Sequence, residues 1–238
     1  MHWRQLLKGS QLFYKNEPLA RFYLEYMRNK NWHSWESPEV TDAEVSKLFD
    51  FVNQWRTHVP RGREQEEGFK EAYRESYRFL QMLRAEKLET VDFEREIYEG
   101  KSVSHIIYQV FERIAHFGYR EELVAASKML HTIAPNLFVM WDSNICAGYA
   151  VQGAYEYAHK FLPRMQKQIK EAIDTYVSDN KCNVHDAIKA ICDPQANEFL
   201  AKLLKECSLL NFNLSLTKLV DEYNYVKFTL RLDELWDC

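Results

Sequence analysis

Residues that interrupt regular structure are scarce in this sequence, which has only 7 glycines and 6 prolines among its 238 residues. Because these two residue types punctuate helices and strands, their scarcity favours long helices and short connections. The motifs G-x-G-x-x-G, G-x-x-x-x-G-K-[ST], G-x-S-x-G and H-E-x-x-H do not occur. The usual dinucleotide sites, phosphate-binding loops, serine-hydrolase elbows and zinc-protease helices are therefore excluded.

A surplus of positive charge is also missing, because the formal net charge is −4. Such a charge gives no general attraction to nucleic acid or membranes, so a nucleic-acid site has to be a local basic patch. No apolar run reaches the length of a membrane span, and the start of the chain lacks the charged and apolar regions of a signal peptide. We therefore expect a cytoplasmic protein that does not interact with membranes.

The 5 cysteines are scattered and odd in number, as expected of reduced intracellular thiols. Only Cys182-x-x-His185, with Cys192 nearby, has a spacing that resembles a metal site. One pair and a third residue within an amphipathic segment indicate core packing instead. We predict no metal and no other cofactor.

Apolar residues recur with the spacing of an α-helix along most of the chain. Thr41 and Glu44 form a capping box before one such segment, and Ser102 can cap another. These segments cover residues 45–52, 69–83, 103–114, 120–134, 165–176 and 199–207. Residues 224–232 fit a helix or a strand, and we predict a helix. The sequence thus predicts an all-α protein folded as one domain over residues 1–238.

The stretch LFVMWDSNIC, residues 137–146, leads apolar residues directly into Asp142. One interpretation is that Asp142 is the N-cap of a helix, because its carboxylate can accept backbone N–H bonds and meets the positive end of the helix dipole. That role does not explain why apolar residues directly precede Asp142, or why Trp141 is adjacent to it. A carboxylate beside large apolar groups is poorly solvated, and its protonation is set by its neighbours, which suits an enzyme.

The order of these elements resembles the helix-hairpin-helix DNA glycosylase superfamily. The resemblance covers about residues 102–150: a helix, a short turn at Gly118, the helix REELVAASKMLHTIA, the apolar stretch NLFVMW, and Asp142 at a helix start. In that family a hairpin of two helices holds the DNA backbone, and the aspartate at the next helix is essential. The resemblance implies a two-lobed helical domain, with the first segment and the tail forming the second lobe and the active site in the cleft.

By this resemblance Asp142 is the catalytic residue of a DNA glycosylase that releases a damaged or modified base. A fixed carboxylate can stabilise an oxocarbenium-like sugar and orient the attacking water. The implied partner is double-stranded DNA and the implied state is a monomer. The role is either DNA repair or defence against modified phage DNA, and the sequence leaves both open.

The sequence departs from the family in three ways. The glycine-rich hairpin turn is replaced by HFGYREE, and the four closely spaced cysteines of cluster-containing members are missing. The lysine of strand-cleaving members would fall near Val124, whereas Lys128 lies about one helical turn later. We therefore predict a monofunctional enzyme that uses Asp142 and water.

Further residues are candidates for contacts with DNA. Since a flipped base is held by stacking and hydrogen bonds, aromatic side chains near Asp142 are candidate stacking surfaces: Trp141, Tyr149 and Trp55. Lys128 and His131 are expected on the face of their helix away from the core, where they can contact phosphate. The complete set of predicted DNA-binding residues is Lys128, His131, Ser143, Asn144 and Arg164.

Two other functions fit the sequence. Arg28 and His33 form an R-N-x-x-x-H arrangement, which resembles the signature of HEPN ribonucleases, all-α enzymes that cleave RNA without a metal. A non-catalytic helical interaction module is the third alternative, because a fold class alone does not imply chemistry.

Overall fold

A computed structural model of the protein describes residues 1–29, 34–209, 212 and 214–236. The protein is mostly helical, with 70% of its residues in helices and 2% in strands. The prediction of an all-α fold is thereby confirmed at the level of fold class. Among the described residues, no helix combines the length and the apolar composition needed to cross a membrane.

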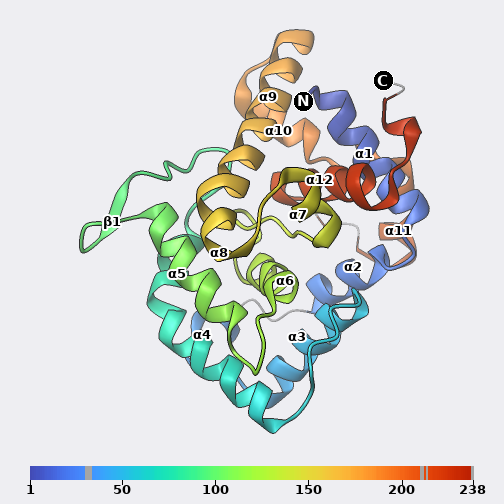
Figure 1. The fold of residues 1–238 in the computed structure, drawn as a ribbon. Coiled ribbons are helices and arrows are strands. Elements are labelled where there is room, and N and C mark those ends of the chain that lie inside the picture. Colours follow the sequence, from blue (N-terminus) through green and yellow to red (C-terminus); the bar gives the residue numbers. More distant parts are fainter. Residues whose placement is uncertain (30–33, 210–211, 213, 237–238) are drawn as a thin grey trace.

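Helices from the two ends of the chain pack together. They form the upper part of the molecule in Figure 1, where the two termini also lie. Helix α1 packs mainly on α12 and also contacts α9 and α11. The helices of this group are α1 (Trp3–Asn16), α9 (Leu162–Asn180), α10 (Val184–Ile191), α11 (Glu198–Glu206) and α12 (Leu216–Tyr225).

The middle of the chain supplies the remaining helices. In Figure 1, α3 to α6 form the lower part of the molecule, and α7 and α8 lie between them and the upper group. Helix α5 packs against α4, α6 and α8, and α3 contacts both α4 and α6. The helices are α2 (Ala20–Asn29), α3 (Asp42–Gln54), α4 (Arg63–Arg84), α5 (Val103–Ala115), α6 (Leu123–Ile133), α7 (Ser143–Tyr149) and α8 (Gly153–Glu156).

Side-chain caps fix where several helices begin. Thr41 Oγ1 accepts a hydrogen bond from the Glu44 backbone N–H at 3.3 Å, and the Glu44 side chain accepts one from the Thr41 N–H at 2.8 Å. Ser102 caps α5 by accepting from the N–H of His105. Both predicted caps are confirmed, because such contacts span only three residues and depend little on the rest of the fold.

Helix α6 is buried on all sides, which the sequence did not predict. Every residue from Ala125 to Ile133 is buried, including Lys128 and His131. The expectation that these two side chains lie away from the core is therefore wrong. Since α3 and α5 pack against α6 and Lys128 lies over the ring of Trp55, only the first two residues of the helix, which are half-buried, can meet solvent.

One short hairpin interrupts the helical fold. Strands β1 (Glu96–Tyr98) and β2 (Lys101–Ser102) pair antiparallel. Glu99 and Gly100 between them have φ values of 47° and 74°, the left-handed conformation that a tight two-residue hairpin turn requires. The all-α prediction did not include these strands.

The C-terminal segment continues beyond α12 in a wider helical turn. A π-helical turn covers Val226–Leu230, and Arg231 ends it with a φ of 55°. The prediction of a helix in this segment is confirmed as far as Leu230. Another π-helical turn joins α8 to α9 at Tyr157–Phe161, and short 3-10 helices lie at Ser34–Glu36, Pro194–Ala196 and Asp233–Trp236.

Candidate active site around Asp142

Asp142 is held at both carboxylate oxygens. Its Oδ1 accepts a hydrogen bond from the backbone N–H of Ile145 at 2.8 Å, which makes it the N-cap of α7. Its Oδ2 accepts a hydrogen bond from Thr229 Oγ1 at 2.6 Å. Thr229 belongs to the turn after α12, so the C-terminal segment fixes the orientation of a carboxylate that is only half-buried.

The apolar segment that precedes Asp142 is part of the core. Residues 137–141 are all buried, and Trp141 is 1% exposed. The Trp141 indole N–H donates to the Leu123 carbonyl at 3.1 Å, and its ring contacts Phe111, Tyr157 and Phe161. Trp141 borders an open groove beside α7, but it is almost fully buried among neighbouring rings, and the stacking prediction is not supported. Through the hydrogen bond to Leu123, Trp141 instead connects the segment that contains Asp142 to the start of α6.

Tyr149 is likewise enclosed. Its hydroxyl donates to Asn224 Oδ1 at 2.6 Å and accepts from Gln168 at 2.7 Å. Burial raises its pKa to about 12. The ring contacts Phe228, and the exposed guanidinium of Arg164 lies 4.6 Å from the ring centre. Tyr149 therefore has a structural role in this arrangement, whereas Arg164 is accessible to a partner.

Ser143 and Asn144 are exposed on the first turn of α7. Ser143 lines an open groove of about 710 Å³ between α7 and the start of α6. Val124, the position where the family resemblance would place a lysine, lines the same groove. Ser143 and Asn144 are thus accessible, and they directly follow the half-buried Asp142 in the chain.

Lys128 lies inside the protein rather than on its surface. It is 6% exposed, and its Nζ is 5.3 Å from the centre of the Trp55 ring. No hydrogen bond or ion pair to Nζ occurs among the described residues. Burial lowers the pKa of Lys128, and the negative charges of Asp221 and Asp142 oppose that shift. A phosphate contact at the surface is therefore not supported for Lys128.

His131 has a structural role as well. It is fully buried, its Nδ1 donates to the Phe138 carbonyl at 2.7 Å, and its Nε2 lies 3.0 Å from the Tyr23 hydroxyl. These contacts join α6 to α2 and to the segment that leads to Asp142. Because the side chain is 0% exposed, the structure does not support DNA binding by His131.

Trp55 is half-buried at the end of α3. Phe13 stacks on its ring with a centroid distance of 6.2 Å, and Lys128 lies over the ring at 5.3 Å. The indole N–H is buried without a hydrogen-bond partner. Trp55 is thus close to the predicted site, but its ring already has neighbours, and stacking with a base would require Lys128 to move.

A cluster of buried charges on α12 was not predicted from the sequence. Lys218 is 0% exposed, and its Nζ lies 2.7 Å from Asp221 Oδ2 and 3.6 Å from Glu222 Oε1. Tyr225 donates to Glu17 Oε2 at 2.7 Å, which links α12 to the end of α1. The spacing of these charged residues along α12 is that of one helix face. A charged face usually meets solvent, and for this reason their burial could not be predicted from the sequence.

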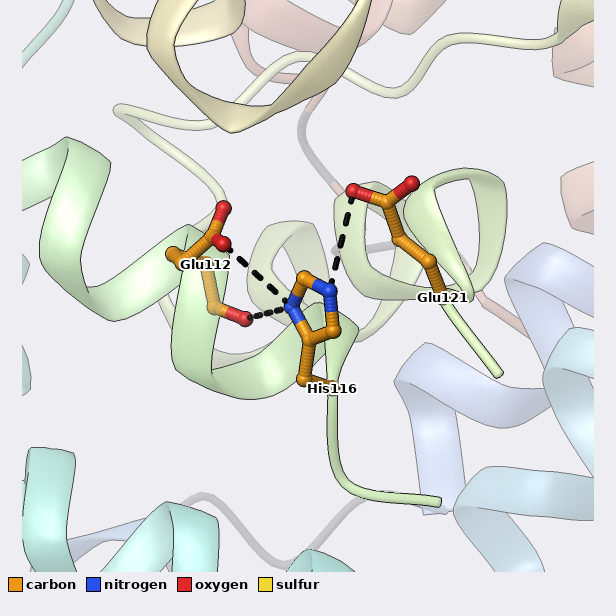
Figure 2. Close-up of side chains that lie close together, drawn as sticks. All are labelled: Glu112, His116 and Glu121. Carbon is orange, nitrogen blue, oxygen red and sulfur yellow. Dashed lines mark hydrogen bonds and ion pairs between the residues drawn. The ribbon is translucent and has the colours of Figure 1, made fainter. Parts of the chain in front are cut away.

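The turn between α5 and α6 carries negative charge. Figure 2 shows His116 between Glu112 and Glu121, with the ring Nδ1 2.9 Å from the Glu112 carbonyl and Nε2 3.9 Å from Glu121 Oε1. Among the described residues these side chains are close enough to one another to hold a metal ion, whereas Cys182, His185 and Cys192 form no such group. Two carboxylates at this turn oppose the contact with DNA phosphate that the family resemblance implies.

Of the two residues in the ribonuclease alternative, only Arg28 lies within the described part of the chain. Arg28 is exposed at the end of α2, and its guanidinium donates to the Cys207 carbonyl at 3.0 Å. His33 lies outside the described residues. The pairing of Arg28 with His33 stays a prediction.

Comparison of the chain with protein-family models, with curated proteins and with solved structures gave no match. The functional inference therefore depends on the geometry around Asp142.

Proposed function

We propose that this protein hydrolyses N-glycosidic bonds in DNA, with Asp142 as the catalytic carboxylate. One observation carries the proposal: a carboxylate at a helix start has both oxygens fixed by hydrogen bonds. An oriented charge of this kind is what an oxocarbenium-like transition state requires. The order of the elements around Asp142 agrees with the resemblance to helix-hairpin-helix glycosylases.

The proposed reaction uses water. As the bond between sugar and base breaks, positive charge develops on the sugar, and the Asp142 carboxylate stabilises it. The same carboxylate orients a water molecule for attack on the sugar carbon. The base leaves with the electron pair of the broken bond and takes up a proton equivalent to the one that the attacking water loses, so the products are a free base and an abasic site in an intact strand.

The proposed DNA contact lies near the C-terminal turn rather than at the turn between α5 and α6. Arg164 is exposed above Tyr149, and it is close enough to Lys227 for its charge to lower the pKa of that lysine, after the larger effect of burial. Basic side chains favour phosphate, whereas Glu112 and Glu121 repel it. In this proposal the packed helices α1, α9, α11 and α12 form the second lobe, and DNA binds between the two lobes.

The test is base release by an Asp142→Asn variant. The purified protein is incubated with duplexes that carry damaged or phage-type modified bases, and released bases are identified by mass spectrometry. Asparagine already caps helices in this chain, since Asn183 accepts from Asp186 N–H and Asn197 from Leu200 N–H. Asp142→Asn should therefore fold normally and release no base, because only the negative charge is lost.

Asp193→Asn is the matched control, because Asp193 also caps a helical turn with its side chain but is distant in sequence from the site. It should release base at the wild-type rate. Full base release by a folded Asp142→Asn protein would refute the catalytic role. Early melting of Asp142→Asn, with no base released by the wild type, would leave capping as the role of Asp142.

A further inference from the structure

Two lysines are buried in contrasting environments within the part of the chain that the structure describes. Lys218 is paired, with its ammonium against Asp221 and Glu222. The Lys128 side chain is also more than nine-tenths buried, yet its ammonium has no hydrogen bond or ion pair among the described residues and lies 5.3 Å from the centre of the Trp55 ring. Burial of an amine without a partner destabilises a fold. The fold therefore gains nothing evident from the amine of Lys128.

We propose that Lys128 is a ligand-binding residue, whose amine donates a hydrogen bond to an acceptor atom of a molecule bound beside Asp142. The identity of that molecule as a nucleobase rests on the proposed function. That the Lys128 amine donates to a ligand is inferred from the burial of its side chain and from the absence of a hydrogen-bond partner within the described residues. Trp55, over whose ring the amine lies, has a buried donor without a partner, its indole N–H.

The charges around Lys128 select the class of ligand. Asp221, Asp142 and Glu17 exert attractive effects on the Lys128 ammonium, and Lys218 a repulsive one. The surroundings thus hold at least as much negative as positive charge, so an anionic ligand such as phosphate is disfavoured. A neutral planar molecule with a carbonyl acceptor satisfies the unpaired donors without adding negative charge. We therefore expect a neutral heterocycle, such as a nucleobase that carries a carbonyl group.

Replacing Lys128 with methionine removes the amine and nearly keeps the side-chain volume. It therefore distinguishes a role of the amine in ligand binding from a role in stability. Lys128→Met should raise the Tm, since a side chain that is 6% exposed would no longer carry an amine without a protein partner and would keep a similar length. Lys218→Met is the matched control and should lower the Tm, because it leaves Asp221 and Glu222 buried without their cation. A fall in Tm for Lys128→Met similar to that for Lys218→Met would show a structural role and overturn the proposal.

Binding is measured by NMR titration of the intact protein with hypoxanthine, uracil and inorganic phosphate. Wild type should bind at least one of the two bases and not phosphate, and Lys128→Met should bind that base roughly tenfold more weakly. Unchanged affinity in the variant, binding of phosphate alone, or binding of no probe would each overturn the proposal. If the bases bind through Lys128 but no base is released from DNA, the inference stands and the proposed glycosylase function fails.

Discussion

Thr229→Val removes a single hydrogen bond that crosses the molecule. Valine has nearly the shape of threonine but cannot donate to Asp142 Oδ2, which now accepts from the Thr229 hydroxyl at 2.6 Å. A hydrogen bond to a charged group contributes about 1.5–3 kcal/mol. Because both side chains are half-buried and water can replace part of the bond, we expect a loss of about 1–2 kcal/mol in the free energy of unfolding.

A double-mutant cycle with Asp142→Ala isolates this contact. Unfolding in urea is measured for wild type, Thr229→Val, Asp142→Ala and the double variant. If Thr229 stabilises the protein through Asp142, the two losses will not add, and the interaction energy will be about 1 kcal/mol. Additive losses, within about 0.3–0.5 kcal/mol, would refute the reasoning that Thr229 acts on the carboxylate.

Base release tests the same contact at the proposed active site. Thr229→Val should lower the rate about tenfold, as a loss of about 1.4 kcal/mol in the transition state does, and Thr229→Ser should restore it. Thr175→Val is the control, because Thr175 Oγ1 accepts from the Trp3 N–H at 3.1 Å and caps α1 at another part of the molecule. It should lower stability without changing the rate per folded molecule. Equal rates for the two valine variants would contradict a positioning role for Thr229.

Four further outcomes follow from the structure. Gly148→Ala should destabilise the protein by about 1–3 kcal/mol, since an added Cβ would lie 2.3 Å from Phe228 Cδ1; Phe228→Leu should reduce this loss in chemical denaturation. Burial raises the pKa of Glu222 to about 7 from 4.5, so the folded state holds a proton that the unfolded chain releases. Stability should therefore fall as pH rises from 4.5 past 7, and Glu222→Gln should flatten this slope. Arg164→Glu should weaken binding to all DNA duplexes alike and reduce the salt dependence of binding. Unchanged affinity would show that Arg164 does not contact DNA. Borohydride should trap no covalent protein–DNA complex while abasic sites form. A complex that is trapped with the wild type but not with Lys128→Ala would contradict the water mechanism.

Helix positions and caps were predictable from the sequence because they depend on neighbours along the chain. The capping box of Thr41 and Glu44 and the N-cap role of Asp142 both involve groups three residues apart. The apolar spacing of α5 also identified its buried face correctly. Such contacts form wherever the helix forms, so the surrounding fold cannot change them.

The surroundings of Asp142 were decided by tertiary structure alone. Thr229, which donates to its carboxylate, is 87 residues away in sequence, and no local pattern pairs the two. Lys128 and His131 follow the spacing of a solvent-exposed face, yet other helices cover α6 on that side.

The same limit applies to α12. Lys218, Asp221 and Glu222 have the spacing of a charged helix face that meets water, but packing on α1 buries them. Periodicity shows which residues share a face of a helix, because it depends only on the geometry of the backbone. Whether that face meets water, a lipid, a partner or another helix depends on where distant segments pack. The sequence therefore determined the helices and their caps, and the packing of distant helices determined which charges are buried beside Asp142.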